Sequence, residues 1–503
     1  MPVSRHLSCA RTSIATGLRV RLGRAVSALA LLAQLGVVTP TMAETLDEAL
    51  LATYQTNPKL DAERARLRAT DEEVPRAKAG FKPTANATAD YGVQKSTTRP
   101  GASADGTSHG HGYQVNVRQS LFSGFRTVNT VREAEATVRA GRENLRNVEA
   151  QVLIEAVTAY ADVLRDTALV QLRERAVANF TRELQAAEAR RSVREVTRTD
   201  VAQTQTRRAK ALSALDLARA NLKASRASYE RVVGRPPDRL RDPGLPRKQL
   251  PSHLDDAIKI AEKEAPNVVA ALYREQAARH AVDKIWGELL PEVSLEAAYG
   301  QRFDSSPLIT NQDAATVTGR LNMPLYEGGE TKSRVRQAKH THVSRIQEIE
   351  QARGETQAQV VTAWSRLQAS KAQQETDRIQ VQSAKTALEG VREEEKVGQR
   401  TLLEVLNAEQ EVIEAEIGAL SDRRDLTIAA YTLLSVIGRL NAGELKLGDS
   451  QYDPEVHYED VRGKWFGVSI THADGRVEAL EKLENWGAVD QYMDAQKLRP
   501  SLR

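Results

Sequence analysis

The chain has 503 residues, with 71 Lys and Arg against 67 Asp and Glu, and a net charge of +4. Five arginines precede the first acidic residue, Glu44, and removing their charges from +4 leaves −1 for the remainder. That balance argues against a nucleic-acid-binding protein, which needs a clustered basic excess. The only cysteine, Cys9, excludes a disulfide framework, and an aromatic content of 4% is low for the core of a large enzyme.

The first 43 residues have the pattern of an export signal. A basic stretch ends at Arg24, an apolar run extends from Ala25 to Val38, and Thr41 and Ala43 supply small residues before a cut at Glu44. The run of about 14 apolar residues is too short to span a bilayer, which takes roughly 20. No later run of 18 apolar residues follows, so the sequence predicts an exported protein that is free in the envelope or sits in a membrane as a barrel.

The rest of the chain is internally duplicated. Leu46-Asp47-Glu48-Ala49 matches Leu254-Asp255-Asp256-Ala257 at an offset of 208, and Leu121-Phe122-Ser123-Gly124 matches Leu325-Tyr326-Glu327-Gly328 at an offset of 204. We therefore expect a first structural repeat over residues 44–234 and a second over 252–438. A proline-rich linker over 235–251 joins them, and an equatorial or partly disordered tail covers 439–503.

Each repeat is predicted to begin with helices and continue with two strands. The helical segments run from about Thr45 to Gly80 and from Leu254 to Leu289, and Pro58 and Pro266 should break them. Two strands are expected within about 82–122 and two within about 291–326, because apolar and polar residues alternate there. A polar loop should separate the two strands of each pair, as in a hairpin.

Two long proline-free helical stretches follow, from about Phe125 to Ser192 and from Gly329 to Val397. Their apolar residues recur at coiled-coil spacing, and at 1.5 Å per residue each stretch makes a rod of about 100 Å. Short breaks near Val193 and Val397 precede returning helices that end at Gly234 and Gly438, so each repeat carries a long helix pair over 125–234 or 329–438.

Four amphipathic strands cannot stand in a bilayer alone, because their edges would leave backbone groups unpaired in hydrocarbon. Two or three copies of the chain would supply eight or twelve strands and could close a barrel, and only a larger barrel leaves an open bore. The polar strand face would line that bore, through Asn116, Arg118, Thr318, Arg320 and Asn322. The alternative is a soluble sheet with one solvated face.

At this point the chain resembles the TolC family of outer-membrane efflux and secretion channels. The resemblance covers essentially Thr45–Arg439. It depends on both strand-to-helix junctions, and on the two helix turns Val196-Thr197-Arg198-Thr199-Asp200-Val201 and Val397-Gly398-Gln399-Arg400-Thr401 with its continuation to Glu409.

The resemblance implies a mainly α fold with a β-barrel portion: a homotrimer whose 12-stranded outer-membrane β-barrel continues into a 12-helix coiled-coil periplasmic tunnel. It implies a passive exit duct, in contact with outer-membrane lipid, for drugs, toxic compounds or proteins. A periplasmic membrane-fusion adaptor and an inner-membrane transporter of RND or ABC type would recruit and open it. No enzyme activity, cofactor or metal is expected.

The resemblance also implies roles for residues near the helix turns. Arg400 would lock the closed state by bonding Thr199 and Asp200 of a neighbouring helix pair, and an arginine fork suits that task. Glu404 and Asn407 stand where the family places two acidic rings at the periplasmic aperture, so one negative ring is expected here. Arg194 departs from the family, which has glycine in this turn.

Other functions remain open on the sequence alone. A trimeric envelope-anchored structural or adhesive protein would use the rods as spacers and would transport nothing. A soluble periplasmic enzyme finds no support, because the sequence contains no phosphate loop, HExxH motif or nucleophile elbow. The acidic run Glu393-Glu394-Glu395 suggests a solvated helix face.

Overall fold

A computed structural model describes residues 43–97, 106–246, 249–306, 309–448, 451–471 and 477–478. The predicted export signal lies outside these residues, apart from Ala43. From Glu44 onward the described residues belong to one compact unit. None of the helices described in it is long and apolar enough to cross a membrane.

Each half of the chain begins with short helices that break at a proline. Thr45 and Glu48 form the capping box of the first helix, with N–H···O distances of 3.3 and 3.1 Å. Asn57 ends that helix and caps the next, which has Pro58 at its first position. A further break at Glu72 was not predicted. The helices are α2 (Leu46–Thr56), α3 (Pro58–Asp71), α4 (Glu73–Lys78), α7 (Leu254–Glu264) and α8 (Pro266–Trp286).

The strands of the two halves join in one four-stranded antiparallel sheet of order β1-β4-β5-β6. β1 pairs with β4, β4 with β5, and β5 with β6, so β1 and β6 are its two edges. The four strands are β1 (Thr84–Tyr91), β4 (His111–Ser123), β5 (Glu292–Ser306) and β6 (Ile309–Asn322).

The strand boundaries correct the sequence prediction in two places. In the second hairpin, β5 extends to Ser306 and β6 begins at Ile309, so both strands include residues that were expected to form a polar loop. The first loop holds a small ribbon of β2 (Gln94–Ser96) and β3 (Gly106–Ser108). Backbone pairing in these stretches does not require an apolar face, so the hydrophobic alternation gave no signal there.

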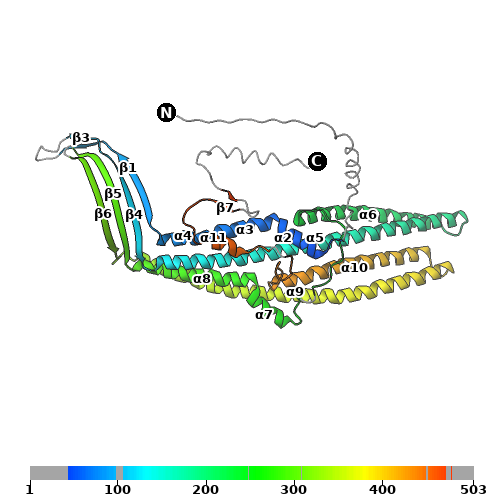
Figure 1. Cartoon of the computed structure of the whole chain (residues 1–503). Coiled ribbons are helices and arrows are strands. Elements are labelled where there is room, and N and C mark those ends of the chain that lie inside the picture. Colours follow the sequence, from blue (N-terminus) through cyan, green and yellow to red (C-terminus); the bar gives the residue numbers. More distant parts are fainter. Residues whose placement is uncertain are drawn as a thin grey trace, which may run out of the picture. The chain divides into compact units, whose positions relative to one another are not determined.

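Four long helices complete the two halves. The helix expected over Phe125–Ser192 starts at Arg126, and the one expected over Gly329–Val397 runs from Glu330 to Lys396. The sheet lies at one end of these helices and the two helix turns lie at the other (Figure 1). Gly234 and Gly438 have φ of +85° and +82° where the returning helices end. The helices are α5 (Arg126–Ser192), α6 (Arg198–Val233), α9 (Glu330–Lys396) and α10 (Leu402–Val436).

The main hydrophobic core lies where the short helices meet the middle of α5 and α9 and the C-terminal ends of α6 and α10. Tyr160 of α5, Tyr229 of α6 and Leu434 of α10 are fully buried there. Towards the helix turns the packing thins to a small cluster around Phe180 and Leu406, surrounded by alanines. Small side chains let long helices approach closely along a narrow stripe.

Glu44 fixes the linker to the first repeat. Its backbone N–H donates to the Arg239 carbonyl at 2.7 Å, and its carbonyl accepts from the Arg241 N–H at 2.9 Å. Its buried carboxylate accepts from the Tyr229 hydroxyl at 2.8 Å and from Arg235 at 2.7 Å. These hydrogen bonds fix the start of the linker, where the chain passes from the first repeat towards the second.

The tail forms helix α11 (Pro454–Val461), which packs on α3 in Figure 1. Asp71 is fully buried in α3, and its carboxylate lies 3.0 Å from His457 Nδ1. Burial raises the pKa of Asp71, and His457 opposes that effect. After α11, β7 (Ile470–Thr471) and β8 (Val477–Glu478) form a short antiparallel strand pair.

Candidate functional site

The polar face of the sheet gathers the predicted lumen residues. Arg118 of β4 pairs with Glu296 of β5, which pairs with Thr318 of β6. Arg320 pairs with Ser294, and Asn322 with Glu292, two residues apart along each strand. Asn116 lies two residues from Arg118, so all five predicted residues share one face.

Two glutamates that the sequence reasoning did not single out balance the arginines of this face. Arg118 lies 3.1 Å from Glu292 and 3.7 Å from Glu296, and Arg320 lies 3.2 Å from Glu296. Arg126, at the start of α5, adds a contact of 2.7 Å to Glu292. The polar face is therefore lined by paired charges. Glu296 stood in the polar alternation of its strand, which was the available signal.

Gly112 of β4 permits a further ion pair across an entire strand. It lies between Asp90 of β1 and Arg302 of β5, and Arg302 reaches over it to within 3.2 Å of Asp90. A Cβ atom at Gly112 would lie 2.6 Å from the Gln301 carbonyl oxygen. Only glycine fits this position, where the neighbouring backbone approaches closely.

The opposite face of the sheet is apolar and exposed in the single chain. Val317 and Leu321 of β6 are 74% and 69% exposed. A register shift at Leu121 of β4 places Phe122 opposite Val293, so the apolar face continues on Phe122. Exposed apolar surface of this extent marks contact with an apolar partner or with lipid.

The two helix turns at the far end are built alike. Thr197 caps α6 and Thr401 caps α10. Arg194 has φ of +66° in the first turn, and Gly398 has φ of +77° in the second. The left-handed conformation costs a residue other than glycine roughly 1 kcal/mol. The Arg194 departure therefore keeps the turn geometry at the expense of backbone strain.

Within one chain Arg400 does not meet its predicted partners. Its guanidinium donates to Glu394 at 2.8 Å and to Glu404 at 3.3 Å. The Asp200 carboxylate instead accepts from the Thr197 backbone N–H at 2.8 Å. The predicted contact of Arg400 with Thr199 and Asp200 of a neighbouring helix pair is not formed within the chain, and its formation with a helix pair of another copy stays a prediction.

Asn407 and Glu404 also have partners in the chain. Asn407 Oδ1 accepts from Arg207 of α6 at 2.7 Å, and Glu404 shares Arg400 with Glu394. Arg207 was not predicted, because it lies 200 residues away in the sequence. Glu404 and Asn407, which are predicted to line the aperture, therefore each contact an arginine within the chain.

A second contact between the helix pairs, an ion pair, corrects the interpretation of the acidic run Glu393-Glu394-Glu395 as a solvated helix face. Arg190 of α5 contacts Glu395 of α9 at 2.6 Å, and the Glu395 side chain is only 16% exposed. Glu395 therefore does not belong to a solvated face, whereas Glu393 is well exposed. The tie joins residues 205 apart, and neither turn motif contains both.

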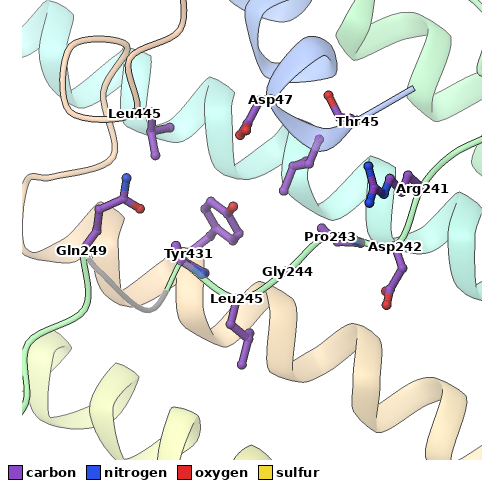
Figure 2. A pocket seen from close by; sticks show the side chains of 12 residues that line it. Thr45, Asp47, Arg241, Asp242, Pro243, Gly244, Leu245, Gln249, Tyr431 and Leu445 are labelled. Atoms are coloured by element: carbon purple, nitrogen blue, oxygen red, sulfur yellow. The ribbon is translucent and has the colours of Figure 1, made fainter. Parts of the chain in front are cut away.

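A cleft of about 420 Å³ opens where the linker crosses the start of α2 and the C-terminal part of α10 (Figure 2). Thr45, Asp47, Arg241 and Tyr431 are among its lining residues. Burial, with the charge of Asp47, raises the pKa of Tyr431 to about 12. Asp242, at its rim, forms an ion pair with Arg423 of α10. The cleft thus lies beside the anchored linker, far from the helix turns.

Comparisons with known proteins agree with this architecture. The profile of a family described as outer membrane efflux protein matches residues 50–235 and 257–439. Outer membrane efflux protein BepC of Brucella suis is 37% identical over 436 residues, which cover 86% of this chain and 94% of BepC. Alkaline protease secretion protein AprF of Pseudomonas aeruginosa is 25% identical over 366 residues, 71% of this chain and 74% of AprF.

Among solved structures, the outer membrane protein VceC of Vibrio cholerae shares the fold. Its TM-score is 0.67 at 18% identity, with 78% of this chain and 96% of VceC covered.

Proposed function

Because this chain belongs to the outer membrane efflux protein family, we propose that three copies form a passive exit duct across the outer membrane and the periplasm. The three four-stranded sheets would close one twelve-stranded barrel, and the long helices would continue it as a twelve-helix tunnel. Drugs, other toxic compounds or secreted proteins would pass through it.

One observation carries this proposal: the sheet is complete within the chain except at its edges, β1 and β6. In hydrocarbon an unpaired edge leaves its backbone groups without hydrogen bonds, and each costs several kcal/mol. Pairing β6 of one copy with β1 of the next removes all edges at once. The paired charges of Arg118, Glu292 and Glu296 would then face the bore, and Val317 and Leu321 would face lipid.

The energy for transport would come from an inner-membrane transporter, of RND or ABC type, joined to the duct through a periplasmic adaptor. BepC is named for efflux and AprF for protease secretion, so both classes of cargo support the proposal. The helix turns near Arg194 and Gly398 would meet these partners, because they are the ends farthest from the sheet (Figure 1).

At this end Glu404 and Asn407 would form the periplasmic aperture. Arg400 would hold it closed through Thr199 and Asp200 of the adjacent copy while keeping Glu394 and Glu404 as partners within its own chain. Opening would require these contacts, and the Arg190–Glu395 tie, to give way or to move together.

Single-channel recording tests the duct. The mature protein, purified from membranes and inserted in planar lipid bilayers, should give discrete current steps. Silence from a correctly assembled trimer would favour the alternative of a structural or adhesive spacer. Crosslinking in intact cells, followed by identification of the captured inner-membrane protein, distinguishes an RND-type from an ABC-type partner.

A further inference from the structure

The two repeats differ in the residues that lead into the sheet. At the offset of 208, Lys78 and Lys82 of the first repeat correspond to Trp286 and Leu290 of the second. Both pairs lie just before a strand, β1 or β5. Trp286 is 50% exposed, so the second repeat presents an aromatic ring where the first presents lysine.

The C-terminal strap, residues 454–470, covers these lysines. Lys78 Nζ donates to the Arg462 carbonyl at 3.3 Å, and Lys82 Nζ donates to the Lys464 carbonyl at 2.8 Å. Lys82 Nζ also lies 4.7 Å from the centre of the Trp465 ring, within the range of a cation–π contact. The strap thus brings a tryptophan to the place where the first repeat lacks one.

Helix α11 fastens the strap to the first repeat. Glu455 contacts Arg142 of α5 at 2.9 Å, and His457 contacts Asp71 of α3. Tyr458 packs beside the small cluster of Val74 and Val138. The aromatic residues that follow α11, Trp465 and Phe466, are therefore held close to the start of β1.

The strap exposes a group of apolar side chains to solvent, with basic residues beside them. Trp465 is 59% exposed and Phe466 is 86% exposed, and both Val468 and Ile470 are more than half exposed. Arg462 and Lys464 flank them, and Glu459 offsets Arg462 at 3.0 Å. Tryptophan with neighbouring basic residues is the combination that settles at the boundary of a bilayer, with anionic headgroups near the cations.

We infer that the C-terminal strap is an interfacial anchor that binds the phospholipid surface where β1 leaves the membrane. The occupant is lipid for two reasons. Phe81, just before β1, and Phe125, just after β4, add further exposed apolar surface beside the same end of the sheet, at 53% and 58% exposed. The charges of the strap also complement phosphate headgroups. This inference rests on the proposed function, since it requires the sheet to span the outer membrane.

Tryptophan fluorescence in nanodiscs with brominated or unbrominated lipid tests the anchor. The chain has four tryptophans, so three variants of the full mature protein each keep one of Trp465, Trp286 or Trp364 and carry Phe elsewhere. Trp465 should lose emission in brominated lipid and be shielded from aqueous iodide. Trp364, which packs against the main core, should not respond to the lipid.

The variant that keeps only Trp286 distinguishes a failure of the anchor from a failure of the proposed membrane position of the sheet. Quenching of Trp286 without quenching of Trp465 would overturn the anchor alone, and iodide protection of Trp465 in that case would assign the patch to a protein contact. Quenching of neither would overturn the membrane position of the sheet as well. Lys464→Glu should reduce the quenching of Trp465 in anionic lipid, whereas Lys396→Glu, at the distal end of α9, should leave it unchanged.

Discussion

Arg400, the proposed gate residue, already stabilises the helix turn within its own chain. Its fork already holds Glu394 and Glu404 within the chain, so a contact with a second copy would add to these and not replace a free charge. The pKa of Arg400 is raised by its hydrogen bond to Glu394 and then by Glu404. It is therefore charged throughout the physiological range.

We predict that Arg400→Ser increases single-channel conductance severalfold. The substitution releases Glu404 and removes the proposed lock, so the aperture should widen and become more selective for cations. Conductance and reversal potential in planar bilayers measure both effects, and drug leakage in cells reports the same opening. Unchanged conductance would count against the lock.

Arg207 would add to the proposed aperture a positive charge that the sequence analysis did not predict. It donates to Asn407, where a carboxylate would have completed a second acidic ring. We predict that Arg207→Ala combined with Asn407→Asp lowers the half-blocking concentration of a trivalent cation on the order of tenfold, about 1.4 kcal/mol. Asn407→Asp alone should do much less, because Arg207 would pair with the new acid.

Arg208 supplies the matched control for this experiment. It is the next residue in α6 but bonds Thr181 at 3.1 Å, so Arg208→Ala with Asn407→Asp should behave as Asn407→Asp alone. Equal block in both double variants would show that Arg207 has no special role at the aperture.

The polar sheet residues were predictable from the sequence, whereas the contacts between helices near the two turns were not. Asn116, Arg118 and Thr318 follow from strict alternation, which depends only on neighbours in the chain. The Arg190–Glu395 and Arg207–Asn407 contacts join residues 205 and 200 apart. Such contacts depend on how two helix pairs align, and local patterns do not encode that alignment.

At the scale of the element, helix α5 shows the cost of burying a charge. Glu149 accepts a hydrogen bond of 2.6 Å from the Ala442 backbone N–H, which attaches the turn after α10 to α5. Burial raises the pKa of Glu149, and the hydrogen bond and the nearby Arg64 and Arg146 only partly compensate. Its contribution to stability is therefore full below the ordinary value of 4.5 and is lost as the pH rises through the raised value.

We predict that Glu149→Gln raises the unfolding temperature at pH 8 and gives no gain at pH 4. The amide oxygen can still accept from Ala442, and no charge is buried. Thermal unfolding of the detergent-solubilised protein at both pH values measures the difference. Glu155→Gln, on the same helix but half exposed, should show no such pH dependence. Equal effects of Glu149→Gln at both pH values would contradict the burial argument.

Helices were easier to predict than strand ends. The long helices begin and end within a residue or two of the expected positions, because proline-free apolar periodicity extends over many turns. The strands exceeded the prediction where polar residues predominate, as in Gln301–Ser306 of β5, in which Phe303 is the one apolar side chain. The register shift at Leu121 could not be predicted either, because no particular residue type in the sequence marks a β-bulge.

For the whole molecule, the two strand-to-helix junctions point to the assembly. Gly124 faces Gly287 so closely that a Cβ on either would lie 2.2 Å from the other's carbonyl oxygen. Gly328, its equivalent at the offset of 204, has φ of +64° and nothing near its Cβ direction. The missing neighbour should be the equivalent of Gly287, which is Ala79, from another copy.

We predict that Ala79→Cys with Glu330→Cys forms crosslinks between copies. Within one chain, a Cβ at Gly287 would lie 3.0 Å from the Arg126 side chain, and Ala79 and Glu330 are the equivalent pair. A short bismaleimide should give dimers and trimers on denaturing gels from the double variant only. A double variant that stays monomeric with the same reagent would contradict the trimer.

The order β1-β4-β5-β6 gives each copy two different edges, so any ring grows head to tail and closes only when the last edge meets the first. Until the ring closes, every partial ring has an unpaired strand edge at each end, where another copy can pair. A copy damaged at β6 but intact at β1 could join a partial ring and then prevent its closure. A cell that makes both versions would lose finished rings out of proportion to the defective share, and inheritance of such a defect would be dominant.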